Sequence, residues 1–218
     1  MAKALKQVDS TDLLGMDFVS DPQLAPDAAA AAVVVTRIVS AAGGKAEPPK
    51  PSRGKADKAG KYEPPRYRSR IEFYDLTGKG RPKAVELTQG KYSDSAPRFS
   101  PTGAELAFLS VREEGVGPNL YLMPLGGGQA RPLTSHKAGV GEFVWHPDGR
   151  RIAYMSRGDW QDEAAKNGLP RRITKSKWRY DGAGVLPSEP AQVHLVDCRT
   201  GKSRKLTELK DPAADLAF

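Results

Sequence analysis

The stretch WHPDGRRIAYMS, residues 145–156, decides the fold because an earlier part of the chain repeats it. Residues 99–110 read FSPTGAELAFLS, with an aromatic residue, a proline and a glycine at the same places and a similar apolar run behind them. The copies begin at residues 99 and 145, which are 46 residues apart. Self-similarity at such a period is typical of repeat architectures, so we expect a chain of repeated units.

Each unit also contains a hairpin that turns at glycine. The hairpins span residues 71–88, 120–134 and 193–207, and each ends in a Leu-Thr pair. Short strands joined by glycine-rich turns, about four to a unit, are typical of the blades of a β-propeller. We therefore predict an all-β fold, a partial β-propeller with about three blades of four-stranded antiparallel sheets and an irregular insertion.

A first, degraded copy of the repeat begins at Leu24. When Leu24 is aligned with Phe99, Pro26 matches the proline of the repeat and Ala28 takes the place of the turn glycine. The β-branched run at residues 33–35 favours a strand here, although the alanines before it favour a helix. We therefore predict an N-terminal segment of residues 1–23 and a partial propeller over residues 24–218.

Two stretches interrupt the repeat. Residues 45–70 contain five prolines, nine basic and three acidic residues, and almost no apolar side chains before Tyr62. Such a composition buries too little surface to become ordered, which predicts a disordered, basic, proline-rich insert. Residues 157–190 form a loop insertion where the preceding unit has only residues 111–118, and residues 161–167 can form a short helix.

Charge and composition exclude several classes of function. The formal net charge is +8, of which the basic insert supplies +6 and the rest of the chain +2, so we expect no nucleic-acid partner. We expect no membrane contact either, because no stretch resembles a signal peptide or is long and apolar enough to span a bilayer. The single cysteine, Cys198, cannot form an intrachain disulfide, which favours a cytoplasmic protein with Cys198 half-buried in a strand.

The repeat, an aromatic residue with Ser/His-Pro-Asp-Gly and then Ile/Leu-Ala-Phe/Tyr, resembles the propeller repeats of the TolB protein and of the prolyl oligopeptidase family. Residues 18–27, FVSDPQLAPD, are similar to the first-blade opening of acylaminoacyl peptidases in that family. Residues 171–184, RRITKSKWRYDGAG, with HLVD at residues 194–197, resemble the mid-propeller segment of those enzymes. Together these stretches cover nearly the whole chain apart from the basic insert.

The resemblance implies the gating and substrate-selecting propeller of a serine peptidase that acts on short or N-acylated peptides. The α/β-hydrolase domain that carries catalysis in this family is missing from these residues. The fragment nearest to its G-x-S-x-G motif, residues 201–205, lacks the second glycine and is interpreted as a plain turn. We thus expect a chain that is non-catalytic by itself.

Further partners follow from the same resemblance. The remaining blades and the hydrolase domain are expected partners, because Phe218 stands where another copy of the repeat would open. Open blade edges also favour pairing, so a homo-oligomer is a further expectation. The alternative is a TolB-like propeller that binds a protein partner and has no enzymatic domain.

Most residues that could carry chemistry are interpreted structurally, and we expect no cofactor, no metal site and no catalytic residue. His136, His146 and His194 lie in different segments without the spacing of metal ligands. Asp148 is interpreted as a turn residue whose side chain bonds the backbone two residues on. Trp145, at the start of a unit, is interpreted as part of the core between blades.

Candidate substrate-binding residues lie in the loop insertion instead. A guanidinium group matches a carboxylate by paired hydrogen bonds, so arginines on a loop of this kind suit peptide carboxyl ends. A solvated loop or a subunit contact is the alternative. The residues that we predict to bind substrate are Arg171, Arg172, Trp178, Arg179 and Tyr180.

Overall fold

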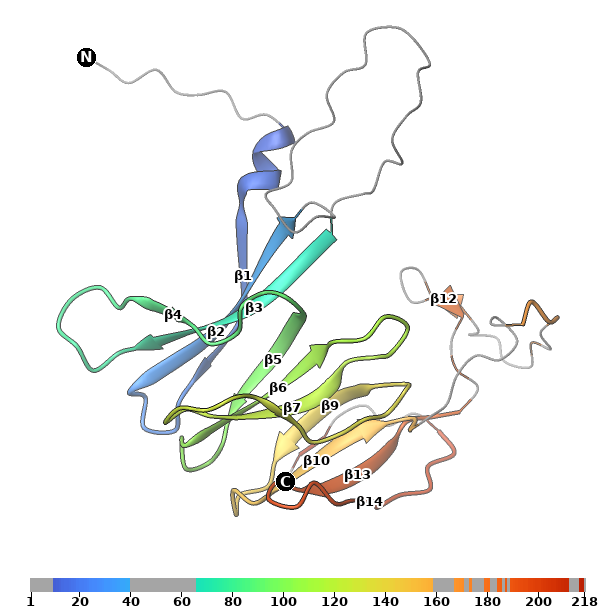
Figure 1. Cartoon of the computed structure of the whole chain (residues 1–218). Helices are drawn as coiled ribbons and strands as arrows, with labels where there is room; N and C mark the ends of the chain where they lie inside the picture. The colour runs from blue at the N-terminus through green and yellow to red at the C-terminus, as the bar shows by residue number, and fades with distance from the viewer. Residues whose placement is uncertain are drawn as a thin grey trace, which may run out of the picture. The chain divides into compact units, whose positions relative to one another are not determined.

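The computed structural model describes residues 10–39, 66–158 and 189–211, together with parts of 167–187 and residues 216–217. The chain divides into two compact units, Met1–Pro97 and Arg98–Phe218. Three four-stranded antiparallel sheets account for nearly all of the regular structure, as Figure 1 shows. The prediction of an all-β fold with about three blades is therefore confirmed.

The first sheet has the strand order β1-β2-β3-β4 and follows a short 3₁₀ helix, η1. These elements are η1 (Ser10–Gly15), β1 (Asp17–Leu24), β2 (Ala30–Val39), β3 (Arg66–Asp75) and β4 (Ala84–Glu86). Val34 of β2 lies opposite Ile71 of β3, and both side chains are buried. The β-branched run thus forms the strand that its propensity predicts, despite the alanines in front of it.

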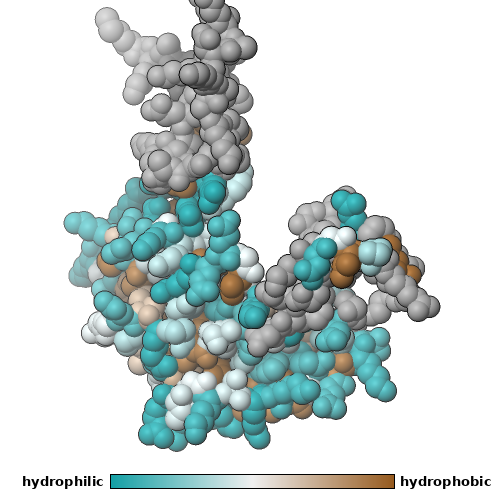
Figure 2. Space-filling model, turned by 45° about the vertical axis from the view of Figure 1, so that its right-hand side comes forward, coloured by the Kyte–Doolittle hydropathy of each residue, from teal (hydrophilic) through white to brown (hydrophobic). Residues whose placement is uncertain are grey.

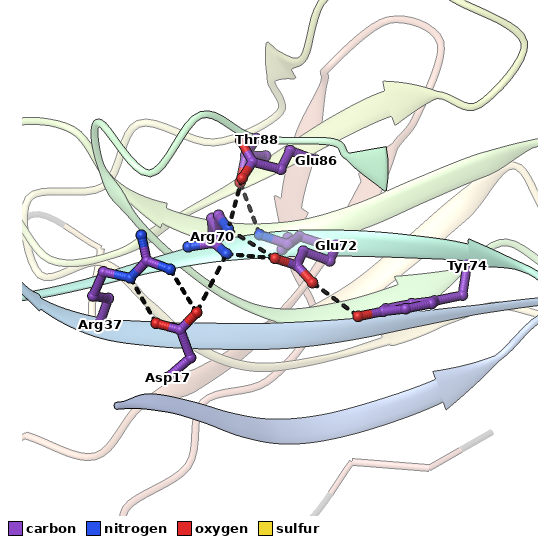
Figure 3. Close-up of polar contacts among 8 residues, drawn as sticks. Asp17, Arg37, Arg70, Glu72, Tyr74, Glu86 and Thr88 are labelled. Atoms are coloured by element: carbon purple, nitrogen blue, oxygen red, sulfur yellow. Dashed lines mark hydrogen bonds and ion pairs between the residues drawn. The ribbon is translucent and has the colours of Figure 1, made fainter. Parts of the chain in front are cut away.

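The other face of the first sheet carries a network of opposite charges (Figure 3). Arg37 donates two hydrogen bonds of 2.6 Å to the Asp17 carboxylate, one to each oxygen. Arg70 Nε donates to Glu72 at 2.9 Å, and the Tyr74 hydroxyl donates to the second oxygen of Glu72 at 2.9 Å. The Glu72 carboxylate thereby raises the pKa of Tyr74. Charge-assisted hydrogen bonds thus join β1 to β2, and an ion pair of 3.8 Å between Arg70 and Asp17 joins β3 to both.

Strand β1 begins at Asp17, within the predicted N-terminal segment of residues 1–23, and ends at Leu24. The division of the chain between residues 23 and 24 stays a prediction. The Asp21-Pro22 pair suggested a turn, but it forms a β-bulge where the register between β1 and β2 shifts after Ser20. Asp21 adopts a positive φ of 48°, and its carboxylate accepts a 3.0 Å hydrogen bond from Gln23. A bulge accommodates a proline that a regular ladder position would exclude.

The second sheet has the order β5-β6-β7-β8 and the third β14-β13-β10-β9. The strands of the second are β5 (Ser93–Phe99), β6 (Glu105–Val111), β7 (Asn119–Pro124) and β8 (Arg131–Pro132). Those of the third are β9 (Val140–Trp145), β10 (Arg151–Ser156), β13 (Gln192–Asp197) and β14 (Ser203–Lys205). A separate small hairpin joins β11 (Arg179–Tyr180) to β12 (Gly184–Val185).

The turn after the first strand of each sheet confirms the three copies of the repeat. In each turn a backbone N–H bonds a carbonyl five residues on: Ala25 to Ala30, Ser100 to Glu105 and His146 to Arg151, at 2.8–2.9 Å. The third turn residue has a positive φ, 55° at Ala28, 72° at Gly103 and 66° at Gly149. Ala28 therefore adopts the conformation that glycine adopts in the other two turns, where a Cβ atom is unfavourable.

Trp145 lies in the core, as predicted. Its side chain is buried, and its indole Nε1 donates a 3.1 Å hydrogen bond to the Arg98 carbonyl at the end of β5. Tyr154 of β10 and Val196 of β13 are fully buried in the same unit. The first strand of the third sheet is thus joined to the second sheet by a directional bond from a buried ring.

The two interruptions are only partly described. Strand β3 begins at Arg66, five residues before the predicted start at Ile71, because it pairs with β2 over ten residues, from Arg66 opposite Val39 to Asp75 opposite Ala30. The rest of the basic insert lies outside the described residues, and so does the helix expected at residues 161–167 except for Asn167, which lies in a turn.

In the view of Figure 2, hydrophilic side chains cover most of the described surface. Within the described part of the chain, no helix is long and apolar enough to cross a membrane.

Candidate functional site at the base of the insertion

The loop insertion leaves the third sheet after Ser156, the last residue of β10, and returns at Gln192, the first residue of β13. The Ser156 hydroxyl is buried, donates to the Gly139 carbonyl at 2.6 Å and accepts from the Gly158 N–H at 2.9 Å. Arg157 Nε donates to the Glu189 carbonyl at 2.9 Å, which joins the outgoing and returning chains. The base of the insertion is therefore held in place by the sheet.

A buried amide fixes the neighbouring loop between β8 and β9. Asn119 Oδ1 accepts 2.9 Å hydrogen bonds from the Thr134 hydroxyl and the His136 N–H. Its Nδ2 donates to the carbonyls of Gly117 at 3.2 Å and His136 at 3.0 Å. One side chain thus satisfies four backbone or hydroxyl groups, and buried polar groups are stable only when they are bonded in this way.

Two glycines allow the loops at this end to touch. A Cβ atom on Gly117 would lie 2.6 Å from the Ala138 carbonyl oxygen, and one on Gly139 would lie 2.7 Å from the Gly117 carbonyl carbon. Gly139 also has a φ of +77°. No side chain fits at either place, because the obstructing atoms belong to the backbone.

The structure brings two of the three histidines together around Tyr154. The Tyr154 hydroxyl and His136 Nε2 lie 2.9 Å apart, and the His194 ring stacks on Tyr154 at 5.2 Å between centroids. Burial raises the pKa of Tyr154. Burial first, and then the charges of His136 and Lys205, lower the pKa of His194. The lowered pKa favours the neutral form of His194, which suits a structural contact with Tyr154 within the sheet.

A cleft of about 390 Å³ opens beside Gly139 and Ser156. Glu142 and Arg157 place opposite charges on its wall, and Val140 and Met155 supply apolar surface. A carboxylate and a guanidinium flanking an apolar cleft can bind the amine, carboxyl and side-chain groups of a short peptide.

The predicted substrate-binding residues are only partly visible. Arg179 is exposed and lies opposite Val185 in the β11–β12 hairpin, and Tyr180 lies opposite Gly184. Arg171, Arg172 and Trp178 lie outside the described residues, so their role stays a prediction. The sequence did not indicate Asn119, Ser156 or the glycine contact, because each depends on loops that meet only in the folded sheet.

The turn predicted at Asp148 is confirmed, whereas Cys198 lies in a turn and not in a strand as predicted. Asp148 accepts a 2.8 Å hydrogen bond from the Arg150 N–H, and this bond, with Arg151, lowers the carboxyl pKa to about 2. Cys198 is more buried than expected, in the turn after β13, and burial raises its thiol pKa to about 12. Gly201 lies in the β13–β14 turn. Within the described ranges, no group of three or more His, Cys, Asp or Glu side chains is placed to hold a metal ion.

No family model matches the chain. It is 30% identical over 220 residues to the uncharacterized peptidase YuxL of Bacillus subtilis. That alignment covers 98% of this chain and 30% of the relative, so the chain spans less than a third of the relative's length.

Three solved structures that superpose on the chain with a TM-score above 0.5 are those of acylaminoacyl peptidases and an isopeptidase. Acylaminoacyl peptidase in complex with Z-Gly-Gly-Phe-chloromethyl ketone superposes with a TM-score of 0.60 at 18% identity, over 90% of this chain and 26% of that one. The Pyrococcus horikoshii acylaminoacyl peptidase gives 0.58 at 17% identity, over 91% and 26%. The AtxE2 isopeptidase gives 0.52 at 18% identity, over 85% and 28%. The repeat, the three sheets and these likenesses together identify the chain as part of a β-propeller, with a fold like that of the corresponding part of acylaminoacyl peptidases.

Proposed function

We propose that this chain is the gating and substrate-selecting part of a serine oligopeptidase or acylaminoacyl peptidase and is non-catalytic by itself. The observation that carries the proposal is the alignment of 98% of the chain with a peptidase at 30% identity. In this proposal the remaining blades and a hydrolase domain are partners within the longer protein. A cytoplasmic location and a homo-oligomer stay predictions of the sequence.

The loop insertion is the part that contacts substrate in this proposal. It emerges from a rigid end of the third sheet, beside a cleft that carries Glu142 and Arg157. Arg171, Arg172, Trp178, Arg179 and Tyr180 then bind the peptide, with the arginines directed to its carboxyl end. Short or N-acylated peptides fit this arrangement because one charged terminus is enough to fix their direction.

The test uses the longer protein that contains this chain. We expect it to release p-nitroaniline from acetyl-alanine p-nitroanilide, and we expect this chain alone to release none. In the longer protein, Arg171→Ala with Arg172→Ala should raise KM for peptides with a free carboxyl end at least fivefold. The same peptides with an amidated end should show little change.

Lys202→Ala is the matched control, because Lys202 is exposed at the other end of the strands. It should leave KM unchanged for both kinds of peptide. A longer protein that cleaves no acyl-peptide would contradict the proposal and favour the TolB-like binding propeller. Cleavage with an unchanged KM in the arginine variant would instead contradict only the assignment of these residues.

A further inference from the structure

A second cleft lies at the opposite end of the third sheet and is lined by three arginines. It has a volume of about 670 Å³, and its walls come from the start of β6, from β8 and from the turns after β9 and β13. The arginines are Arg131, Arg150 and Arg199, and all three are exposed. Glu105 and Asp197 are its acidic residues, so three basic side chains and two acidic side chains line the cleft.

Backbone bonds at Cys198 hold the three arginines together. Arg131 Nη2 donates to the Cys198 carbonyl, and the Cys198 N–H donates to the Arg150 carbonyl at 2.8 Å. Arg199 follows Cys198 directly in the chain. The cysteine itself is buried, so the turn that carries it is fixed against the sheet. The arginines therefore start from a rigid base, which reduces the entropy that binding would cost.

Among the described residues, neither acidic side chain forms an ion pair with these arginines, and the charge of Arg199 is only a minor cause of the lowered pKa of Asp197. Asp197 Oδ1 already accepts hydrogen bonds within its own turn, from the N–H groups of Arg199 and Thr200 and from the Thr200 hydroxyl at 2.8 Å. Among the described residues, no ion pair joins Glu105 to any of the three guanidinium groups. Neither Arg150 nor Arg199 has a carboxylate partner for its guanidinium in that part of the chain.

We propose that this arginine cleft binds an oxyanion group, a carboxylate or a phosphate, through Arg131, Arg150 and Arg199. A guanidinium presents paired N–H donors that match both groups, and charge-assisted bonds of this kind are stronger than neutral ones. Arg131 keeps one donor on the Cys198 carbonyl and offers the others to the ligand. The ligand thereby joins β8 to the two turns of the third sheet.

This site is separate from the candidate substrate site. Arg151 and Ser156 mark the two ends of β10, and a strand of six residues spans roughly 17 Å at about 3.3 Å per residue. The insertion leaves at the Ser156 end, whereas the arginine cleft lies at the Arg151 end. Oxyanion binding here therefore does not depend on peptide binding, and either proposal can fail without the other.

The test is calorimetric titration of the 218-residue chain with sodium phosphate and, separately, with disodium succinate. Sodium chloride holds the ionic strength constant, because exposed charges are screened by salt. We expect saturable binding of at least one anion, with a dissociation constant on the order of 1 mM. Binding of phosphate alone, succinate alone or both identifies the source of the oxyanion.

The variant Arg150→Gln with Arg199→Gln should weaken binding at least tenfold. The control Arg204→Gln with Lys210→Gln removes the same charge from exposed positions outside the cleft and should change binding less than twofold. If the first variant does not fold, Arg150→Lys with Arg199→Lys keeps the charge, loses the paired donors and should still weaken binding severalfold. Absence of saturable binding to both anions, or equal weakening in the control, would overturn the proposal.

Discussion

The two ends of the third sheet are built in different ways. The insertion end is the Ser156 end of β10, and the arginine end is its Arg151 end. At the insertion end, buried polar side chains and touching glycines join separate loops, with Asn119 and Ser156 bonded to several backbone groups. At the arginine end, the turns are exposed and their side chains bond to the backbone of the same turn. The Asp148 carboxylate, for example, accepts a hydrogen bond from the Arg150 N–H. A buried polar group that loses its hydrogen-bond partner destabilises the folded protein, whereas an exposed polar group bonds to water instead. The insertion end should therefore tolerate substitution far less than the arginine end.

The largest expected effect comes from breaking the glycine contact. Gly139→Ala places a Cβ atom 2.7 Å from the Gly117 backbone at a φ of +77°. Overpacking and the left-handed conformation together should lower the free energy of unfolding by about 3 to 5 kcal/mol. Urea denaturation followed by tryptophan fluorescence measures this loss.

Gly201→Ala is the matched control at the arginine end. Gly201 has a similar φ of +69°, and no atom lies within 4 Å of the position that its Cβ would take. Only the left-handed conformation is then unfavourable, so the loss should be about 1 to 2 kcal/mol. Equal losses in the two variants would mean that the two ends do not differ in packing.

A smaller effect is expected from the buried amide. Asn119→Ala leaves the Gly117 and His136 carbonyls and the His136 N–H without their partner. We expect a loss of about 2 to 3 kcal/mol in the free energy of unfolding. Asp148→Ala, the counterpart at the arginine end, should cost clearly less because water replaces the exposed carboxylate. The contrast disappears if both substitutions have the same effect on the urea midpoint.

The smallest expected effect is on the pH dependence of stability. The two ends should lose stability in different pH ranges. The pKa of His194 is lowered from 6.5 in the folded protein, so the unfolded chain takes up a proton first as pH falls. The stability that His194 contributes is complete above pH 6.5 and declines as pH falls toward its folded pKa. Asp148 instead keeps its contribution down to its ordinary pKa of 3.8 and loses it toward about 2.

Urea midpoints between pH 8 and 5 test this separation. The wild-type protein should lose stability over that range, and His194→Gln should lose less, because the substituted side chain does not titrate. Asp148→Asn should leave the slope between pH 8 and 5 unchanged. An identical slope in His194→Gln and wild type would contradict the assignment of this pH dependence to His194.

The repeat in the sequence predicted the sheets because its information is local. A turn with proline and glycine, followed by an alternating apolar run, defines a hairpin within about a dozen residues, and all three copies fold accordingly. One local pattern was interpreted wrongly. The Asp21-Pro22 pair is typical of a turn, and only its pairing with β2 identifies it as a bulge.

The clefts and the buried bonds could not be predicted in the same way. Asn119 contacts His136, and Arg131 contacts Cys198, across 17 and 67 positions of the chain. No spacing rule connects such residues, because their distance depends on how successive sheets pack. The predicted substrate residues came from one continuous stretch, whereas the arginine cleft draws on four separate ones.

The connection between the second and third strands has a consequence for protein engineering. In the second sheet this connection is residues 112–118, whereas residues 40–65 and 157–191 occupy the same position in the first and third sheets. Strand pairing on both sides is regular in all three, so sheet register does not depend on the length of this connection. Each doubling of a flexible loop costs only about 0.6 kcal/mol. An affinity tag or a small reporter domain spliced into residues 112–115 should therefore leave the second sheet folded.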